Sequence, residues 1–321
     1  MTNRNNKSVK KISTKNMSER EWLELRTKSI GGSDCGSILG MNKWESPYSL
    51  WVKKVYPDLI KEDQSENEFI YWGNELEDIV AKEFERRTNK KVRRHNYMMY
   101  HKNYDFISAN VDRVVIGENA LLECKTASEY KKGEWQDDNV PGSYMAQCYH
   151  YMSVTGVDRV YIAVLIGGNH FVWKTIERDD EVIEQIIKKE VEFWNDYVVT
   201  KTPPPVDGSD ATSEALNVFW QDTKNSSIVV EDSEASYFKA IQSINKQIKE
   251  LQSEKKGYEN SLKELLGENE KAVTKGYEAT WKRQKQKRID TKRLKSEQPE
   301  IYEKYIKEVE TRPLKIKVGN A

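Results

Sequence analysis

The sequence of 321 residues has few cysteines and histidines and no long hydrophobic run. Its three cysteines (Cys35, Cys124 and Cys148) are odd in number and far apart, which argues against a disulfide framework and indicates a reducing compartment. Three thiols also disfavour a four-cysteine iron–sulfur cluster. The four histidines have no metal-ligand spacing, and we interpret His150 as a packed or surface residue. Without a membrane span or signal peptide, a cytoplasmic protein is expected.

An excess of positive charge is also missing, since 52 Lys and Arg balance 52 Asp and Glu. A net charge of zero does not exclude DNA binding, because affinity depends on local basic patches. The hydrophobic fraction of 37% is adequate for a core, and the length predicts one or two domains.

One hairpin carries the three charged residues that point most directly to chemistry. Residues 108–126 read SANVDRVVIGENALLECKT, two short apolar strands joined by a turn. Because side chains alternate along a strand, Glu123 and Lys125 share one face while Cys124 faces the other, and Asp112 lies across the hairpin from that pair. Asp, followed by Glu-x-Lys, is the metal-dependent nuclease signature PD-(D/E)-x-K, here with valine in place of proline.

These residue types fit a magnesium ion, which prefers oxygen ligands and keeps several waters. Asp112, Glu123 and the backbone carbonyl of Cys124 would supply oxygens, and Mn²⁺ would be able to substitute. A bound ion polarises the scissile phosphate and lowers the pKa of its water. Lys125 would orient or deprotonate that water and offset negative charge. The alternative is a hairpin with an exposed ion pair, and the motif alone does not decide.

Two helical segments carry further polar candidates. Residues 70–86 have apolar side chains at helical spacing, with Glu77 in the helix. Glu77 would complete the metal shell, or would simply favour the helix dipole. Residues 141–155 predict a helix in which Gln147 needs polar partners, either at the metal site or on the backbone.

A third segment, residues 26–40, contains Gly-Gly-Ser-Asp and predicts a turn into a helix N-terminus. Amides and the Ser33 hydroxyl at such a terminus bind phosphate, and Arg26 would add a bidentate grip. An ordinary capped helix is the alternative.

Together and in this order, the four segments resemble the YqaJ-type viral recombinases of the phage lambda exonuclease family, over about residues 20–200. The resemblance implies an α/β (α+β) fold with a restriction-endonuclease-like core, a central mixed sheet flanked by helices. It implies a Mg²⁺-dependent 5′–3′ exonuclease on linear double-stranded DNA, which leaves 3′ overhangs for a single-strand annealing protein (RecT/Redβ-like). It also implies that the protein is a homo-oligomer, namely a trimeric ring. No membrane association is expected, and a phage-encoded protein would act in the cytoplasm of the host cell.

Residue by residue, the resemblance assigns Asp112, Glu123, the Cys124 carbonyl and Glu77 to the metal. The catalytic set comprises the same three side chains with Lys125 and Gln147. The 5′-phosphate and DNA contacts are assigned to Arg26, Ser33, Asn110 and Lys131. Asn110 stands where the lambda-type enzyme has a serine, and Lys131 near an arginine. A lysine keeps the charge but lacks the bidentate fork, so the strength of the 5′-phosphate contact stays open.

The chain divides into four predicted parts. We expect a basic disordered arm at 1–19, the nuclease core at 20–200, a linker with short structured pieces at 201–231, and a C-terminal extension at 232–321. The extension would combine a long helix with a small sheet and bind DNA or a partner.

The long helix of the extension covers residues 232–266, with apolar side chains at heptad-like spacing. It could pack on its own domain, pair with a second helix or self-associate; about four heptads favour a short partner. Residues 281–295 carry eight bases and one acid, which would contact DNA backbone or form a solvated strand edge.

The sequence therefore predicts a metal-dependent exonuclease. Two alternatives stay open: an endonuclease, either a restriction or a branch-cutting enzyme, on the same core, and a non-catalytic DNA-end-binding scaffold. The intact Asp112, Glu123 and Lys125 argue against the scaffold.

Overall fold

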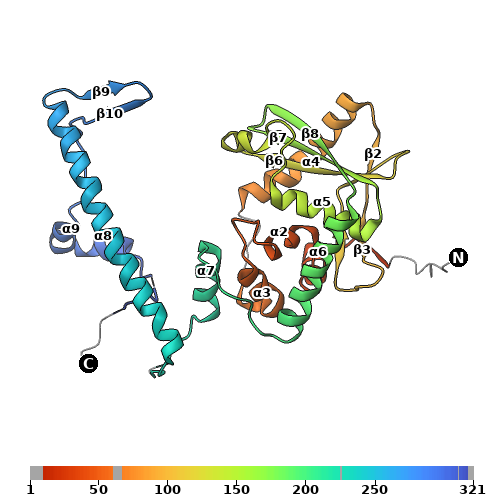
Figure 1. Ribbon diagram of the computed structural model, residues 1–321, viewed down its shortest axis with the longest axis horizontal. Helices are drawn as coiled ribbons and strands as arrows, with labels where there is room; N and C mark the ends of the chain where they lie inside the picture. Colours follow the sequence, from red (N-terminus) through yellow and green to blue (C-terminus); the bar gives the residue numbers. More distant parts are fainter. Residues whose placement is uncertain (1–9, 61–66, 225, 310, 317–321) are drawn as a thin grey trace. The chain divides into compact units, whose positions relative to one another are not determined.

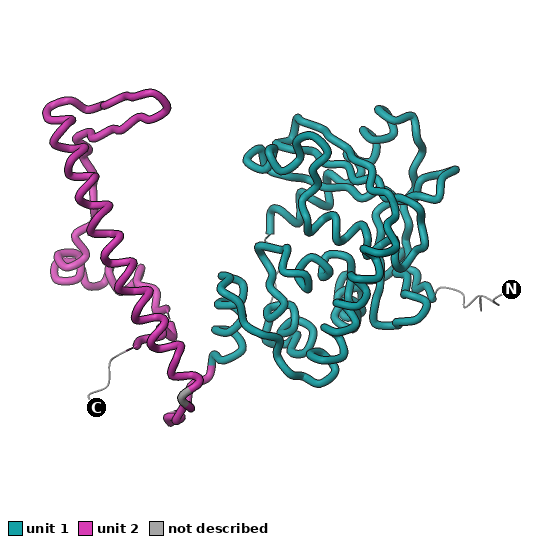
Figure 2. The backbone as a smooth tube through the Cα atoms, in the orientation of Figure 1, with its two compact units in different colours: residues 1–221 teal, residues 222–321 magenta. Residues whose placement is uncertain are grey.

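The computed structural model describes residues 10–60, 67–224, 226–309 and 311–316. The chain forms two compact units, residues 1–221 and 222–321 (Figure 2). Each unit is described by itself.

The first unit is built on a mixed sheet of five strands (Figure 1). β6 and β7 are parallel and are connected through a helical crossover, whereas the other neighbouring strands are antiparallel. The predicted mixed sheet is therefore confirmed. In spatial order the strands are β2 (Val92–Arg94), β5 (Arg113–Val115), β6 (Ala120–Ala127), β7 (Arg159–Ile166) and β8 (His170–Glu177).

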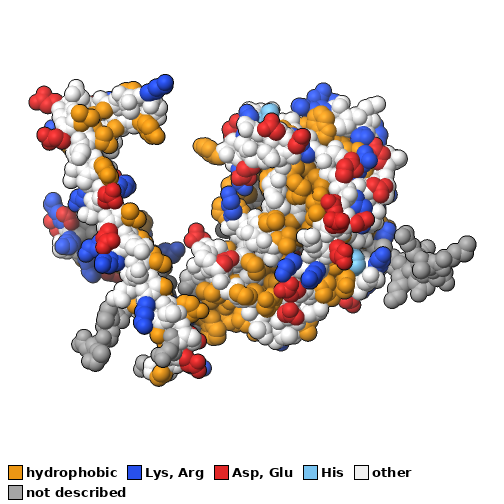
Figure 3. All heavy atoms as spheres, viewed as in Figure 1, with side chains coloured by type: hydrophobic (Ala, Val, Ile, Leu, Met, Phe, Trp, Pro, Cys, Tyr) orange, Lys and Arg blue, Asp and Glu red, His pale blue; other side chains and the backbone are white. Residues whose placement is uncertain are grey.

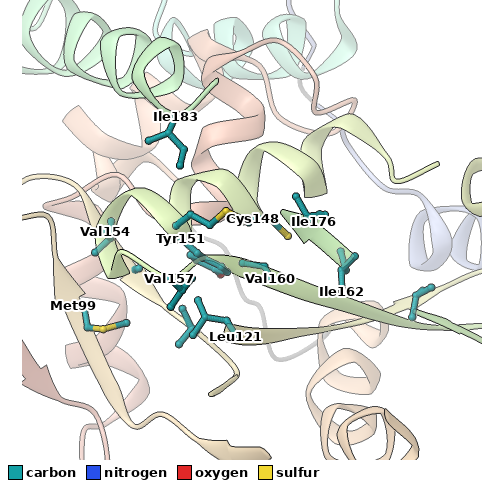
Figure 4. Packing of buried hydrophobic residues seen from close by; sticks show 14 of the residues in the cluster. Met99, Leu121, Cys148, Tyr151, Val154, Val157, Val160, Ile162, Ile176 and Ile183 are labelled. Atoms are coloured by element: carbon teal, nitrogen blue, oxygen red, sulfur yellow. The ribbon is translucent and has the colours of Figure 1, made fainter. Parts of the chain in front are cut away.

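Helices cover both faces of this sheet, because β6 and β7 are apolar on both sides. Leu122 points to α4 (Glu68–Thr88), where it packs in one cluster with Phe84. Leu121 points to the opposite face and packs in a cluster with Tyr151 of α5 (Gly142–Thr155), as Figure 4 shows. The helix α6 (Asp180–Phe193) packs on α5. The predicted flanking helices are thus present.

Smaller elements complete the unit. A second sheet has the order β1 (Lys11–Ser13), β3 (Tyr97–Tyr100), β4 (Ser108–Asn110). The remaining helical segments are α1 (Glu19–Thr27), α2 (Gly32–Ile38), α3 (Pro47–Val55), η1 (Pro57–Leu59), η3 (Glu129–Trp135), the π-helical η4 (Trp194–Val199) and α7 (Asp210–Phe219).

Two predicted boundaries differ from the structure. The expected disordered arm 1–19 contains β1, which pairs with β3, and the first residue of α1; residues 1–9 lie outside the described part. One of the short structured pieces expected at 201–231 is α7, whose Phe219 ring lies 5.2 Å from the Trp51 ring of α3. Burial of these aromatic rings makes α7 part of the core unit, which extends to residue 221.

The second unit contains the predicted long helix and small sheet. Residues 281–290 have no regular secondary structure, so this basic segment is not a strand edge. Of the helices in the described ranges, none is both long and apolar enough to cross a membrane. The elements are α8 (Asp232–Leu266), β9 (Lys271–Thr274), β10 (Tyr277–Thr280), α9 (Thr291–Glu297) and α10 (Pro299–Tyr305).

Candidate active site

The β5–β6 hairpin brings the predicted acidic residues and lysine together. Arg113 pairs with Leu122, so the preceding residue, Asp112, comes next to Glu123. The Cys124 amide donates a hydrogen bond of 2.8 Å to Asp112 Oδ2. Lys125 Nζ lies 2.6 Å from Glu123 Oε1. The structure thus brings the three predicted side chains together.

The charges in this site are strongly coupled. Burial raises the pKa of Asp112 well above its usual value, and repulsion from Glu123 and Glu77 raises it further. Burial alone would lower the pKa of Lys125, but attraction from Glu123 and Asp112 outweighs it and raises the pKa. Lys125 is therefore protonated at neutral pH. It also lies over the Tyr144 ring, 5.0 Å from the ring centre.

The donor set fits a hard divalent cation. Asp112 and Glu123 repel each other, and a divalent cation between them would offset that repulsion. Glu123 is only 3% exposed, and its Oε2 is one of the four buried polar side-chain atoms in the described residues without a hydrogen-bond partner. Such an atom is costly unless it has a ligand. The groups that would hold the ion are these two carboxylates and the Cys124 carbonyl.

Helix α5 supplies the amide that orients Glu123. Gln147 Nε2 donates to Glu123 Oε1 at 2.8 Å and to the Tyr151 hydroxyl at 2.7 Å. The helix α2 packs closely on this pair, because a Cβ atom at Gly32 would stand 2.4 Å from Tyr151 Cε1 and 3.1 Å from Gln147 Cγ. Gln147 thus contacts Glu123, and Gly32 permits the close approach of the two helices.

Glu77 reaches the site from α4 and is held by a residue that the sequence did not single out. Arg113 donates a hydrogen bond to Glu77 and a second one, of 2.5 Å, to Asp78 Oδ1. Its guanidinium also donates to the Asp112 carbonyl at 2.8 Å. Arg113 is 4% exposed, so it fixes α4 against the hairpin in a buried position.

The predicted 5′-phosphate group is only partly assembled. Arg26 Nη2 donates to Ser33 Oγ at 2.7 Å, so these two residues do lie together. The buried Lys54 of α3 was not predicted: it contacts Asp34 Oδ2 at 2.6 Å and donates to the carbonyls of Arg26 and Ser29. A lysine near the end of a helix gives no sequence signal for such a role.

An open pocket of about 450 Å³ is lined by some residues of each of the two groups. Its lining includes Ser33, Lys125, Lys131 and Gln147, so Lys131 shares a pocket with Lys125. Asn110 ends β4, and its side chain has no hydrogen bond to Arg26, Ser33 or Lys131 in the ranges that the structure describes. The structure therefore does not connect Asn110 to the phosphate group.

A buried ion pair between His150 and Glu190 was not predicted from the sequence. His150 Nδ1 lies 2.6 Å from Glu190 Oε1, and His150 Nε2 lies 2.8 Å from the Ser108 carbonyl. Burial lowers the pKa of His150, but the Glu190 carboxylate raises it more. This contact ties α5 to α6 and β4. Cys35 lies beside this pair: its Sγ atom, a ring nitrogen of His150 and a carboxylate oxygen of Glu190 are all within 4.8 Å of one another.

Comparisons with known proteins agree with these motifs. A family model described as the YqaJ-like viral recombinase domain matches residues 21–158. The uncharacterized protein YqaJ of Bacillus subtilis (strain 168) is 48% identical over 306 residues, covering 94% of this chain and 95% of the relative. The uncharacterized protein R354 of Acanthamoeba polyphaga mimivirus is 22% identical over 223 residues, covering 65% and 40% respectively.

Two solved structures are also similar. An alkaline exonuclease (LHK-Exo) from Laribacter hongkongensis has 18% identity and a TM-score of 0.45, covering 57% of this chain and 94% of that chain. A phage-related exonuclease from Haemophilus somnus 129PT has 15% identity and a TM-score of 0.43, covering 56% and 97%. Because the Bacillus relative matches over nearly the whole length of both chains, the chain belongs to the YqaJ-like viral recombinase family.

Proposed function

We propose that the chain is a Mg²⁺-dependent exonuclease that digests linear double-stranded DNA from the 5′ end. The observation that carries the proposal is the convergence of Asp112, Glu123 and Lys125 at one hairpin, where the buried Oε2 atom of Glu123 has no hydrogen-bond partner among the described residues. Oxygen donors beside a protonated lysine suit phosphodiester hydrolysis. Membership of a viral recombinase family supports DNA as the substrate.

The roles of the side chains follow from their contacts. When bound, Mg²⁺ or Mn²⁺ supplies Lewis-acid polarisation of the phosphate and of a water. Gln147 keeps Glu123 in one orientation. Lys125, being charged, donates a hydrogen bond to the phosphate or to the attacking water and offsets the charge that develops on oxygen. We therefore assign Lys125 orientation of the water and stabilisation of charge.

The 5′ polarity is assigned to the group around Arg26. Ser33 lines the same pocket as Lys125, and Arg26 contacts Ser33. A terminal 5′-phosphate bound there would place a phosphodiester bond of the same strand near the hairpin. We further propose that the resulting 3′ overhang passes to a single-strand annealing protein (RecT/Redβ-like) and that the protein is a homo-oligomer, with a trimeric ring as the form that the family resemblance favours.

The proposal is tested with an end-labelled linear duplex, with and without a 5′-phosphate, in Mg²⁺ and in EDTA. We expect loss of label from the 5′ end in Mg²⁺ only, faster with the 5′-phosphate. Lys125→Ala should lower the rate by about 10²–10³-fold, the effect of removing one charge-stabilising donor. The exposed Lys188 of α6 provides the control variant Lys188→Ala, expected to keep the wild-type rate.

Two results would contradict this proposal. Cleavage of a closed circular duplex at the rate of the linear one would indicate an endonuclease. An undiminished rate for Lys125→Ala would exclude the role given to that lysine.

A further inference from the structure

The helix α8 exposes a row of large apolar side chains. Each is at least 36% exposed in the folded chain, and orange side chains follow the length of α8 in Figure 3. An exposed row of this kind is unfavourable in water unless another surface covers it. We call this row the α8 seam; it consists of Ile241, Ile244, Ile248, Leu251, Tyr258, Leu262 and Leu265.

The spacing of the α8 seam identifies the kind of surface that covers it. From Ile241 to Leu265 the positions follow a strict seven-residue repeat, with the a and d positions of each heptad apolar except Lys255. A straight helix has 3.6 residues per turn, so a strict repeat of seven keeps one narrow seam only if the helix winds around another helix. A helix that packs on a globular surface has a wider apolar face. The occupant is therefore a helix with a matching repeat.

The charges at and beside the α8 seam are few, and its one lysine lies among acids. Between Ile241 and Leu265, Lys255 is the one charged a or d residue, and Glu254 and Glu259 are the charged residues at the flanking e and g positions. Lys255 Nζ lies 3.4 Å from Glu259 Oε1 of its own helix. In a parallel pair of α8 helices, Glu254 of one copy would face Glu259 of the other, and Lys255 of each copy, at the a position beside them, would offset their repulsion.

The other charged residues between Ile241 and Leu265 lie on the outer face of the helix, which stays in water in a coiled coil. They occupy the outer b, c and f positions, namely Lys246, Lys249, Glu250, Lys256, Lys263 and Glu264. Burial of about 100 Å² for each of the seven seam side chains would remove roughly 1,400 Å² from water over two helices, which is within the range of stable interfaces.

We propose that α8 is a self-association element, in which the α8 seam pairs with the α8 seam of a second copy of this chain. This interface belongs to the second unit, and it does not depend on the nuclease chemistry of the first. It also accounts for the seam side chains, which each stay at least 36% exposed within the described chain.

Light scattering after size-exclusion chromatography of the full-length protein tests the proposal. The wild type should have a mass of at least twice the chain mass. The double variant Ile248→Asp/Leu251→Asp should have a smaller multiple, since it places charges in two adjacent seam layers. Ser253→Asp adds a charge at an outer f position of the same turn and should keep the wild-type mass.

A second variant strengthens the pairing of the α8 seam, so its result does not depend on whether the double aspartate variant folds. Lys255→Ile should lower the concentration at which the assembly dissociates by about tenfold, because a polar a position reduces coiled-coil stability. Lys256→Ile, at an outer b position, is its control and should leave that concentration unchanged. A monomeric wild type, a seam variant of unchanged mass with its helical circular dichroism intact, or equal effects of the two lysine variants would each overturn the proposal. DNA digestion by a dissociated seam variant would show that the nuclease proposal holds separately.

Discussion

Substitution of Gly32 by alanine tests how closely α2 must approach the site. The added Cβ would stand 2.4 Å from Tyr151 Cε1, whereas carbon atoms in contact are about 3.5–4.0 Å apart. The Tyr151 ring or one of the two helices must therefore shift by about 1 Å. Overpacking of this kind costs about 1–3 kcal/mol of the free energy of unfolding. Because Tyr151 is hydrogen-bonded to Gln147, the shift also reaches the amide that orients Glu123.

The expected result is a loss of both stability and activity. Urea unfolding followed by tryptophan fluorescence should show the lower free energy, and the rate of DNA digestion should fall by about 10²-fold, as for a 1 Å misplacement of a catalytic group. The matched control is Gly73→Ala in α4, where the new Cβ would have no atom within 4 Å. It should stabilise the helix by up to about 1 kcal/mol. If Gly32→Ala unfolds and cleaves like the wild type, the close packing of α2 on α5 is not needed for the site.

Two further predictions concern the buried charges. Arg113→Gln should lower the free energy of unfolding by about 2 kcal/mol in urea titrations, because it leaves Glu77 and Asp78 without their shared cation; an unchanged midpoint would refute this. Glu190→Gln should cost about 3 kcal/mol near pH 6, since it removes the partner of a buried His150. The Glu190 carboxylate raises the pKa of His150 above 6.5, so its contribution is full below that pH and is lost as the pH rises through the folded-state pKa. The difference between wild type and variant should therefore shrink in alkaline buffer, and a difference that grows with pH would contradict the assigned sign.

The hairpin could be predicted from the sequence because its geometry is local. The spacing of Glu123 and Lys125 on one strand fixes a common face, and a short turn fixes their register against Asp112. The long helix of the second unit could be predicted for the same reason, since the repeat of its apolar residues determines the face that they share.

The predicted domain boundaries differ from the structure where contacts between residues distant in sequence determine which segments are ordered. The basic composition of the first residues suggested disorder, but Lys11–Ser13 form a strand because an edge of β3 accepts them. The proline-rich stretch after the π-helical turn suggested a linker, yet Phe219 beyond it packs with Trp51, which lies far away in the sequence. No local pattern indicates that an aromatic residue will find such a partner.

The residues that the sequence could not reveal explain how the predicted ones are held. Arg113 holds Glu77, Lys54 holds the backbone around Arg26, and Glu190 fixes α5 through His150. Each of these is a buried charge that stabilises the fold only through contact with a group distant in sequence. Neither the residue type nor its spacing therefore indicates its role. A motif therefore identifies the groups that face a phosphate, whereas the buried partners determine whether those groups stay within the short distances that catalysis requires.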